Sequence, residues 1–366
     1  MSPKKRPSRQ KRQVVPRPLR PDGSRESEDA RSSGRSQQDQ PQEFFPISLA
    51  SLRLETITGF SLYLHHPKQD SYVLYRRGNL TFGEVHRERL RASRVKQLYI
   101  ASSQRGAYLR YVEEHLDQIL SDPNLSDAEK NEVFYGSATN MMEDLFANPS
   151  VGANVRRTKA FIGTTVHHLI AHPDNTTALI ELLNFDYSTF SHSVNVCIFG
   201  LALASRLGYS SRELDELGIG LMLHDIGKSK IDDAILFKPG ALDEDEWAVI
   251  RMHPDLGLEL VEQATHLSED SAAVIHQHHE RCNGEGYPQN LTAEYIHPYA
   301  KIGAVCDVFD AMTTRRCYRD AVPSYDAIFE MQETMGHQLD RFLLREMVVL
   351  MGPIRDALNG GFAEAA

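Results

Sequence analysis

The sequence predicts a mostly α-helical protein, in which a disordered N-terminal arm and a small α+β domain precede an all-α helical bundle. Three observations predict this order. Residues 1–43 are rich in Arg, Lys, Ser, Gln and Pro and contain few large apolar side chains. Residues 44–150 mix short β-like runs with helical segments. In residues 151–358 nearly every segment repeats apolar residues at three- and four-residue spacing, which is typical of amphipathic helices.

The arm at residues 1–43 cannot bury enough apolar surface to offset the entropy lost on ordering, so we expect it to be disordered. Its Lys and Arg residues would suit a tether to an acidic partner or a membrane surface. Tails of this composition more often only solubilise a protein, and we favour that interpretation.

The composition of the whole chain limits its location and its partners. A formal net charge of -10 argues against binding a nucleic-acid polymer, because such binding rests on Lys and Arg neutralising phosphates. The longest apolar stretch, from Val194 to Leu207, is interrupted by polar residues and is shorter than the ~20 residues that a membrane helix needs. The basic N-terminus has no apolar signal segment, so we expect a cytoplasmic protein without a transmembrane segment.

The cysteines indicate a reducing compartment. Cys197, Cys282, Cys306 and Cys317 are scattered along the chain and form no CxxC pair. This spacing is typical neither of a disulfide framework nor of a zinc ribbon. We interpret all four as packing residues.

The domain at residues 44–150 should contain strands at Ser61–Leu64, Tyr72–Tyr75 and Gln97–Ile100, because these runs are rich in residues that favour strands. A helix is expected at Ala107–Leu120, and a capping box at Ser126–Glu129 opens the next one. The adjacent His65 and His66 follow a strand and are expected in an exposed loop rather than in a metal site. A regulatory or dimerising role and plain structural packing both remain open for this domain.

The small residues around Pro149 and Gly152 mark the expected boundary to the bundle. Short loops separate the helical segments that follow, as expected for a compact bundle. Helices are expected at about Asn154–Ala171, Ser188–Leu207, Arg212–Leu223, Asp243–Met252, Ser268–Gln277, Pro298–Thr314 and Ser324–Met335.

The bundle carries an unusual number of His and Asp residues near the ends of its predicted helices. A single buried His is more often a packing residue than a metal ligand, but several His and Asp residues together can form a metal site. Imidazole nitrogens with carboxylates are the ligands that Fe, Mn and Zn prefer, and an adjacent His-Asp pair can serve two ions at once. The set consists of His192, His224, Asp225, His253, His278, His279 and Asp307.

The segment from Leu223 to Lys228, with the letters LHDIGK, indicates that the predicted metal site processes a phosphate. Gly227 lets backbone approach the site closely, and Lys228 can place an ammonium beside a substrate phosphate. Two ions about 3.5 to 4 Å apart activate a water and clamp both oxygens of a phosphoryl displacement. His253 precedes a proline and should lie at a helix break, where its side chain can turn inward.

A second loop runs from Glu280 to Pro288 and contains Gly284 and Gly286. These residues predict a tight loop in which Tyr287 offers a ring for stacking or a hydroxyl for a phosphate. The alternative is a turn that simply joins two helices.

The His224-Asp225 pair together with Gly286-Tyr287-Pro288 resembles the two signatures of the HD-GYP family, a subset of HD-superfamily metal-dependent phosphohydrolases. The resemblance covers about residues 151 to 350, in family order. It includes Asp186 to Ser193, His224 to Lys228, Lys238-Pro-Gly240, His253-Pro254, His278 to Glu280, Gly284 to Pro288, and Asp307 to Arg319. More weakly, the N-terminal part resembles the accessory domain of some members.

The resemblance implies an HD-type helical bundle and the hydrolysis of cyclic di-GMP. It implies that the seven His and Asp residues are metal ligands, with Lys228 and Arg316 near substrate phosphates. Gly286, Tyr287 and Pro288 are the implied substrate-binding loop. Diguanylate cyclase (GGDEF) domains and a second copy of the chain are candidate protein partners.

Three positions depart from the family pattern. Ser188 stands where members with a third metal have a glutamate, so we expect two divalent ions, Fe or Mn before Zn. Asn283 replaces the usual aspartate and Cys317 the usual proline, and neither change removes a ligand. Asn283 can still alter how the loop is held.

The leading hypothesis is therefore a phosphodiesterase that hydrolyses cyclic di-GMP to pGpG or GMP through a hydroxide activated by two metals. Asp225 would bridge the ions, and Lys228 would assist at the phosphate. His192, His224 and Asp307 would complete one ion, and His253, His278 and His279 the other. Two alternatives remain, namely a catalytically weak nucleotide-binding or protein-interaction module and a phosphohydrolase for another cyclic nucleotide such as cyclic GMP-AMP.

Overall fold

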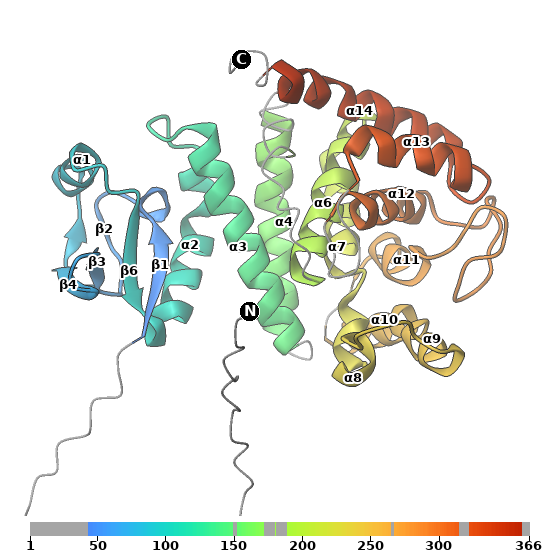
Figure 1. The fold of residues 1–366 in the computed structure, drawn as a ribbon, viewed down its shortest axis with the longest axis horizontal. Coiled ribbons are helices and arrows are strands. Elements are labelled where there is room, and N and C mark those ends of the chain that lie inside the picture. Colours follow the sequence, from blue (N-terminus) through green and yellow to red (C-terminus); the bar gives the residue numbers. More distant parts are fainter. Residues whose placement is uncertain are drawn as a thin grey trace, which may run out of the picture. The chain divides into compact units, whose positions relative to one another are not determined.

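The computed structural model describes residues 43–148, 152–171, 180, 189–264, 267–314 and 322–360. The predicted fold class is confirmed within these ranges, since a small domain with a sheet is followed by a helical bundle (Figure 1). The arm expected at residues 1–43 lies outside the described residues apart from Glu43.

A four-stranded antiparallel sheet opens the described chain, with the strand order β1-β6-β3-β4. Its strands are β1 Phe44–Ser48, β3 Leu62–His66, β4 Ser71–Arg76 and β6 Gln97–Ala101. A separate pair joins β2 (Thr56–Ile57) to β5 (Thr81–Phe82). Pro46 fits β1 because β1 is an edge strand, where a missing backbone N–H need not interrupt a ladder.

Helices complete this part of the chain, at η1 Leu49–Ser51, α1 Glu84–Ala92, η2 Ser102–Gln104, α2 Arg105–Leu120 and α3 Asp127–Ala147. The predicted capping box of α3 is present, because Ser126 Oγ accepts from Glu129 N at 3.3 Å and Glu129 Oε2 accepts from Ser126 N at 2.9 Å. The prediction of a loop at His65 and His66 was wrong. Both residues belong to β3, where Leu64 and His65 pair with residues of β4.

Helix α3 belongs to two cores. Val133 packs in the core under the sheet, with Leu98 and Val112. The next residue, Phe134, and Met141 two turns later pack in the core of the bundle. A helix with two apolar faces is expected to be buried on both, so α3 connects the two cores.

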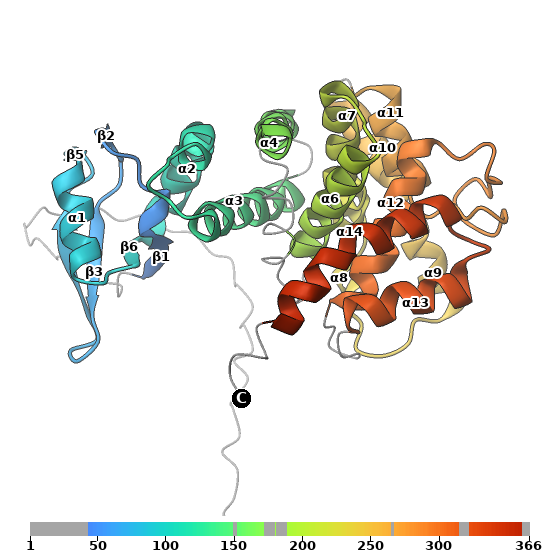
Figure 2. The same cartoon turned by 90° about the horizontal axis from the view of Figure 1, so that it is seen from above.

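The bundle follows with α4 Gly152–Ala171, α6 Thr189–Arg206, α7 Ser211–Leu223, η3 Ile226–Lys230, α8 Asp233–Leu236, α9 Glu244–Ile250, α10 His253–Ala264, α11 Glu269–Gln277, α12 Pro298–Thr313, α13 Ser324–Met335 and α14 Arg341–Gly360. Figure 2 shows α6 beside α7, and contacts link α6 also to α3 and α12. None of these helices, over the described ranges, is long and apolar enough to cross a bilayer.

Helix α6 is the centre of the bundle. Its residues from Ser191 to Ala204 are all buried, as expected for a helix that is apolar on nearly every side. A Cβ at Gly200 would lie 2.3 Å from Leu221 Cδ1, so this glycine lets α7 approach closely. The polar His192 is carried into the interior on the first turn of the same helix.

Candidate metal centre

The structure brings all seven predicted His and Asp ligands together at the ends or inner faces of six helical elements. His224 caps the C-terminus of α7, and Asp225 caps the N-terminus of η3. His253 is the first residue of α10, so the predicted break before Pro254 is present. His278 caps α11 and His279 follows it, while His192 and Asp307 lie on α6 and α12.

Gly227 determines how closely η3 approaches α10. A Cβ at this position would lie 2.0 Å from the carbonyl oxygen of His253 and 2.6 Å from the backbone nitrogen of Gly257. No side chain fits there without moving backbone. The close approach predicted for Gly227 is therefore real, and it brings His253 next to Asp225.

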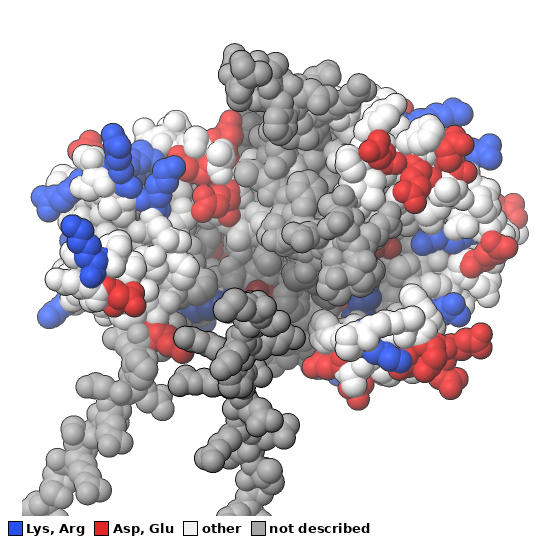
Figure 3. Space-filling model, viewed as in Figure 1, with Lys and Arg blue, Asp and Glu red and all other residues white. Residues whose placement is uncertain are grey.

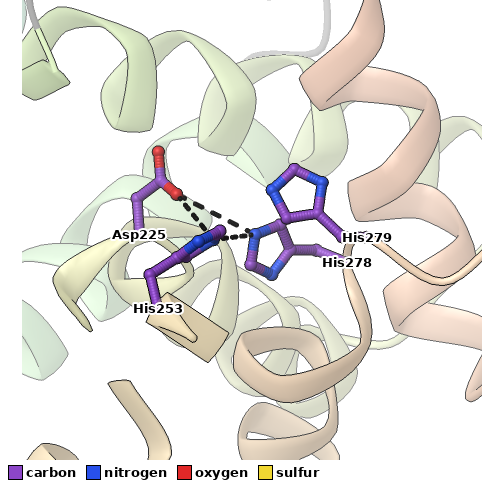
Figure 4. A group of neighbouring side chains, drawn as sticks. All are labelled: Asp225, His253, His278 and His279. Carbon is purple, nitrogen blue, oxygen red and sulfur yellow. Dashed lines mark hydrogen bonds and ion pairs between the residues drawn. The ribbon is translucent and has the colours of Figure 1, made fainter. Parts of the chain in front are cut away.

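Four side chains form the first ligand group, namely Asp225, His253, His278 and His279, and they point toward one another in Figure 4. Asp225 Oδ1 lies 3.3 Å from His253 Nε2 and 3.9 Å from His278 Nε2. The two Nε2 atoms are 3.1 Å apart. One ligand atom of each residue lies within 4.8 Å of the others.

The second ligand group consists of His192, His224 and Asp225. Here the other oxygen of Asp225 is involved, because Oδ2 lies 3.4 Å from His224 Nε2 and 3.7 Å from His192 Nε2. Asp307 contacts both groups, with Oδ1 3.1 Å from His192 Nε2 and Oδ2 3.6 Å from His279 Nδ1. Asp225 thus offers one oxygen to each group, as a bridging carboxylate would.

Backbone carbonyls orient three of the imidazoles. The Nδ1 atoms of His224, His253 and His278 lie 2.6, 2.8 and 2.9 Å from the carbonyl oxygens of residues 221, 250 and 275. A carbonyl only accepts, so each Nδ1 carries the proton and each neutral ring directs the Nε2 lone pair into the cluster. This is the arrangement that a metal-ligating histidine requires.

Asp310 holds His192 in a different way and was missed by the sequence analysis. Its buried Oδ2 accepts from His192 Nδ1 at 2.7 Å. Its Oδ1 accepts from Asn195 Nδ2 at 2.7 Å and from Thr314 Oγ1 at 3.0 Å. The position three residues after Asp307 on α12 was the available signal, because residues at this spacing share a helix face.

Burial and charge favour neutral imidazoles in the first group and ionised carboxylates throughout. Burial, with help from the charge of Lys228, lowers the pKa of His253 to about 4. Burial likewise lowers the pKa values of His278 and His279 well below the usual value. For Asp225, burial opposes ionisation, but Lys228 and the surrounding histidines outweigh it and hold the pKa well below the ordinary value.

His192 and Asp307 form an ionised pair. Burial works against a charged imidazole, but hydrogen bonds from His192 to Asp307 and Asp310 raise the pKa of His192 well above its ordinary value. The same pair lowers the pKa of Asp307 despite its burial. Ligation of an ion by His192 Nε2 would therefore have to displace a proton.

The side chains present fit divalent transition metals. His224 Nε2 and Asp225 Oδ1 are buried and have no hydrogen-bond partner among the described residues, and each such atom costs about 1 to 3 kcal/mol if left unsatisfied. The lone pairs of His253 Nε2 and His278 Nε2 face each other at 3.1 Å. Two nitrogens that share one ion at ~2.1 Å lie roughly 3.0 to 3.4 Å apart, so a cation would satisfy both.

Some of the predicted substrate-binding residues lie at this cluster. Lys228 Nζ donates to Asp225 Oδ2 at 2.6 Å. The ring of Tyr287 stacks on His279 with centroids 4.7 Å apart, and Tyr287-Pro288 is a cis peptide. Arg316 lies outside the described residues, as do Ser188 and Cys317.

Buried Glu280 holds the second loop, a role that was not predicted from the sequence. Its Oε1 accepts from Gln289 N at 2.6 Å and its Oε2 from Leu291 N at 2.8 Å. A Cβ at Gly286 would lie 2.3 Å from Arg281 N, so glycine is required there. The loop is thus a fixed structure beside His279 rather than a simple connection.

Residues 178–343 match the family model for the HD domain. The chain carries an HD domain. The HD superfamily that the resemblance implied is thereby confirmed for this part of the chain, which includes all seven candidate ligands.

Curated relatives of the HD domain are cyclic dinucleotide phosphodiesterases. A cyclic di-GMP phosphodiesterase of Pseudomonas aeruginosa is 38% identical over 184 residues, which are 50% of this chain and 44% of the relative. A cyclic di-GMP phosphodiesterase response regulator of Xanthomonas campestris is 42% identical over 139 residues, 38% of this chain and 37% of the relative. A 3'3'-cGAMP-specific phosphodiesterase of Vibrio cholerae is 36% identical over 133 residues, 36% of this chain and 26% of the relative. The chain thus spans less than half the length of these relatives.

One solved structure resembles more than the HD domain. The HDGYP protein Bd1817 of Bdellovibrio bacteriovorus aligns with a TM-score of 0.61 at 21% identity, over 85% of this chain and 100% of the other. Because the aligned share exceeds the HD domain, the fold likeness includes part of the chain that precedes it.

Proposed function

We propose that the HD domain is the centre of a metal-dependent phosphodiesterase that hydrolyses cyclic di-GMP to pGpG, with GMP as the product of a second cut. The observation that carries this proposal is the position of Asp225, whose two oxygens face two separate groups of histidines. The relatives named cyclic di-GMP phosphodiesterases support the choice of substrate.

The proposed ligands divide between two ions. Asp225 would bridge them, with His192, His224 and Asp307 on one and His253, His278 and His279 on the other. Bound Fe or Mn ions, with Zn as the alternative, would generate a nucleophile from water at neutral pH and neutralise charge on the phosphate.

The protein's own groups would position the substrate and balance its charge. Lys228 carries an ammonium at 2.6 Å from Asp225, so a phosphate held at the centre would lie beside a cation. The stacking of Tyr287 on His279 would hold that imidazole in place and exclude water from one side of it. Arg316 is the second proposed phosphate ligand. GGDEF domains and a second copy of the chain remain proposed partners.

A second candidate substrate is 3'3'-cGAMP, because relatives named as specific for it match this chain at 36% and 32% identity. A panel of cyclic di-GMP, 3'3'-cGAMP and cyclic di-AMP would rank the substrates by kcat/KM. Turnover of any of them by the loaded protein would exclude a role limited to binding.

The mechanism is tested by Asp225→Ala. Because this carboxylate belongs to both ligand groups, we expect metal retention and turnover to be lost together. An Asp225→Ala protein that still hydrolyses cyclic di-GMP would refute the mechanism.

A further inference from the structure

A pocket of about 410 Å³ opens beside the candidate metal centre, within the ~300 to 1,000 Å³ range of small-molecule sites. Two segments form it, the end of α9 and the loop after His279. Tyr287 connects pocket and centre, because it lines the pocket and also stacks on His279. The lining consists of Trp247, Arg251, Glu285, Gly286, Tyr287 and Asn290.

The two α9-side residues of the pocket lie one helical turn apart. Arg251 N donates to Trp247 O at 2.9 Å, so both side chains emerge on the same face. A capping box between Asp243 and Glu246 fixes the start of α9, and Lys238 Nζ donates to Glu246 at 2.7 Å. The helix that carries the indole and the guanidinium is therefore anchored.

The chemistry of these side chains suits a nucleobase. Trp247 is 45% exposed, which is a large apolar surface to leave in contact with water. Arg251 is exposed, and its guanidinium forms no hydrogen bond or ion pair with the described residues. The Glu285 carboxylate is oriented by a hydrogen bond from Asn283 Nδ2 at 2.6 Å. An aromatic face, a cation and an acceptor are thus available in one pocket.

Arg251 also places a positive charge at the far end of a helix whose first turn is acidic. Figure 3 shows acidic side chains gathered at the lower right, where α9 lies in Figure 1. The first turn of α9 contributes Glu244, Asp245 and Glu246. An anionic nucleotide would be repelled by that end and attracted to the Arg251 end, which adjoins the pocket.

We propose that this pocket binds one guanine base of the substrate, and this inference rests on the proposed cyclic dinucleotide hydrolysis. The indole of Trp247 stacks on the base. The Arg251 guanidinium donates to the guanine O6 and N7 acceptors, and the Glu285 carboxylate accepts from its N1–H and N2 amino groups. Adenine presents an amino donor in place of O6, so the Arg251 contact disfavours it.

Trp247 is the single tryptophan of the chain, so tryptophan fluorescence, excited selectively over the 14 tyrosines, reports on this pocket alone. In stopped-flow mixing of the full metal-loaded protein, the amplitude before turnover measures binding. We expect cyclic di-GMP to quench the fluorescence and cyclic di-AMP to need at least ten times the concentration. Unchanged fluorescence while the same protein hydrolyses cyclic di-GMP would overturn the inference and leave the proposed function intact.

Variants separate base binding from the phosphate chemistry. Trp247→Ala should weaken cyclic di-GMP binding, measured by calorimetry, by about 5- to 150-fold, as expected for loss of one stacked base. The metal content of the variant should not change, because Trp247 belongs to neither ligand group. Phe329→Ala, an aromatic residue of α13 that is 58% exposed and outside the pocket, is the matched control and should bind normally.

Arg251→Met tests the hydrogen-bonding part of the inference. It should reduce the preference for cyclic di-GMP over cyclic di-AMP, whereas an equal loss for both would mean that Arg251 binds a phosphate. Quenching by cyclic di-GMP without any hydrolysis would support the pocket and reject the proposed function. Absence of both binding and hydrolysis would reject both.

Discussion

The Nε2 atoms of His253 and His278 lie 3.1 Å apart, and each ring donates its Nδ1 proton to a backbone carbonyl. Neither nitrogen can donate to the other, so the pair is repulsive unless a cation lies between the two lone pairs. Both residues are buried, with His253 0% exposed and His278 1% exposed. This relationship is the strongest physical reason to expect a metal at the first ligand group.

His253→Ala should therefore remove about one metal per chain and reduce turnover at least ~100-fold, because one ion of a two-metal site is lost. Metal content by mass spectrometry and a product assay would measure both. His276→Ala is the matched control, since His276 pairs with Asp255 at 2.8 Å on the surface. Equal metal loss in both variants would contradict the assignment.

Asp310→Asn should lower the affinity for metal by about 10- to 100-fold, because Asp310 orients His192 without belonging to either ligand group. A competition titration with a chelator would measure this affinity, and excess metal should restore turnover. Asp255→Asn changes another His-paired aspartate and should bind metal normally. If excess metal fails to restore the turnover of Asp310→Asn, Asp310 does more than orient His192.

Gly227→Ala should lower both stability and metal binding. The new Cβ would lie 2.0 Å from the carbonyl oxygen of His253, so η3 and α10 must separate, at a cost of roughly 1 to 3 kcal/mol. Gly163→Ala in α4 is the control, because nothing lies within 4 Å of its Cβ, and it should stabilise the protein by up to ~1 kcal/mol. Denaturant unfolding would compare them, and an unchanged midpoint for Gly227→Ala would contradict the close contact.

Asp122→Asn should destabilise the protein at neutral pH. Asp122 pairs with Arg87 at 3.1 Å and with Arg53 at 3.0 Å, and Arg87 is 2% exposed. Arg87 keeps its ion pair with Glu84 at 3.1 Å, so the loss should be smaller than the about 3 to 5 kcal/mol that removing the partner of a buried charge costs. Asp117→Asn, at an exposed aspartate of α2, should leave stability unchanged.

This effect should depend on pH. Burial raises the pKa of Asp122, but the Asn124 backbone N–H and the two arginines outweigh it, and the pKa lies below the ordinary value. The charged form therefore stabilises the fold above the unfolded pKa of about 4, and this contribution is lost as the pH falls through the folded pKa. The unfolding curves of the unchanged protein and of Asp122→Asn should converge below about pH 4. A constant difference in stability down to pH 3 would contradict the stabilising role of the Asp122 charge.

Six of the seven candidate ligands lie near a sequence signal for a helix end or a tight backbone contact, whereas Asp307 lies inside α12. His253 before Pro254 and Gly227 after Asp225 are examples, and the structure places both where these signals indicate. Asp310 was missed although its spacing from Asp307 placed it on the same helix face, because nothing in the sequence identifies His192 on α6 as its partner. Strand β1 was missed for a similar reason, since Pro46 disfavours a strand unless the sequence also reveals that the strand lies at an edge.

The boundary expected near Pro149 is a harder case. Helix α3 precedes that position, but Met141 and Leu145 pack in the core of the bundle. Periodicity identifies an apolar face without naming what it packs against. The division of the chain at residue 150 therefore stays a prediction. A truncation that begins near Val151 would remove α3 and expose the surface of the bundle that α3 covers.

The central claim is that this chain uses bound metals to cut a cyclic dinucleotide, and metal content with product analysis tests it most directly. The protein would be purified anaerobically, loaded with Fe or Mn and incubated with cyclic di-GMP. We predict about two metals per chain and the appearance of pGpG or GMP. Protein that holds no metal, or that holds metal and releases no product from any cyclic dinucleotide, would contradict the account.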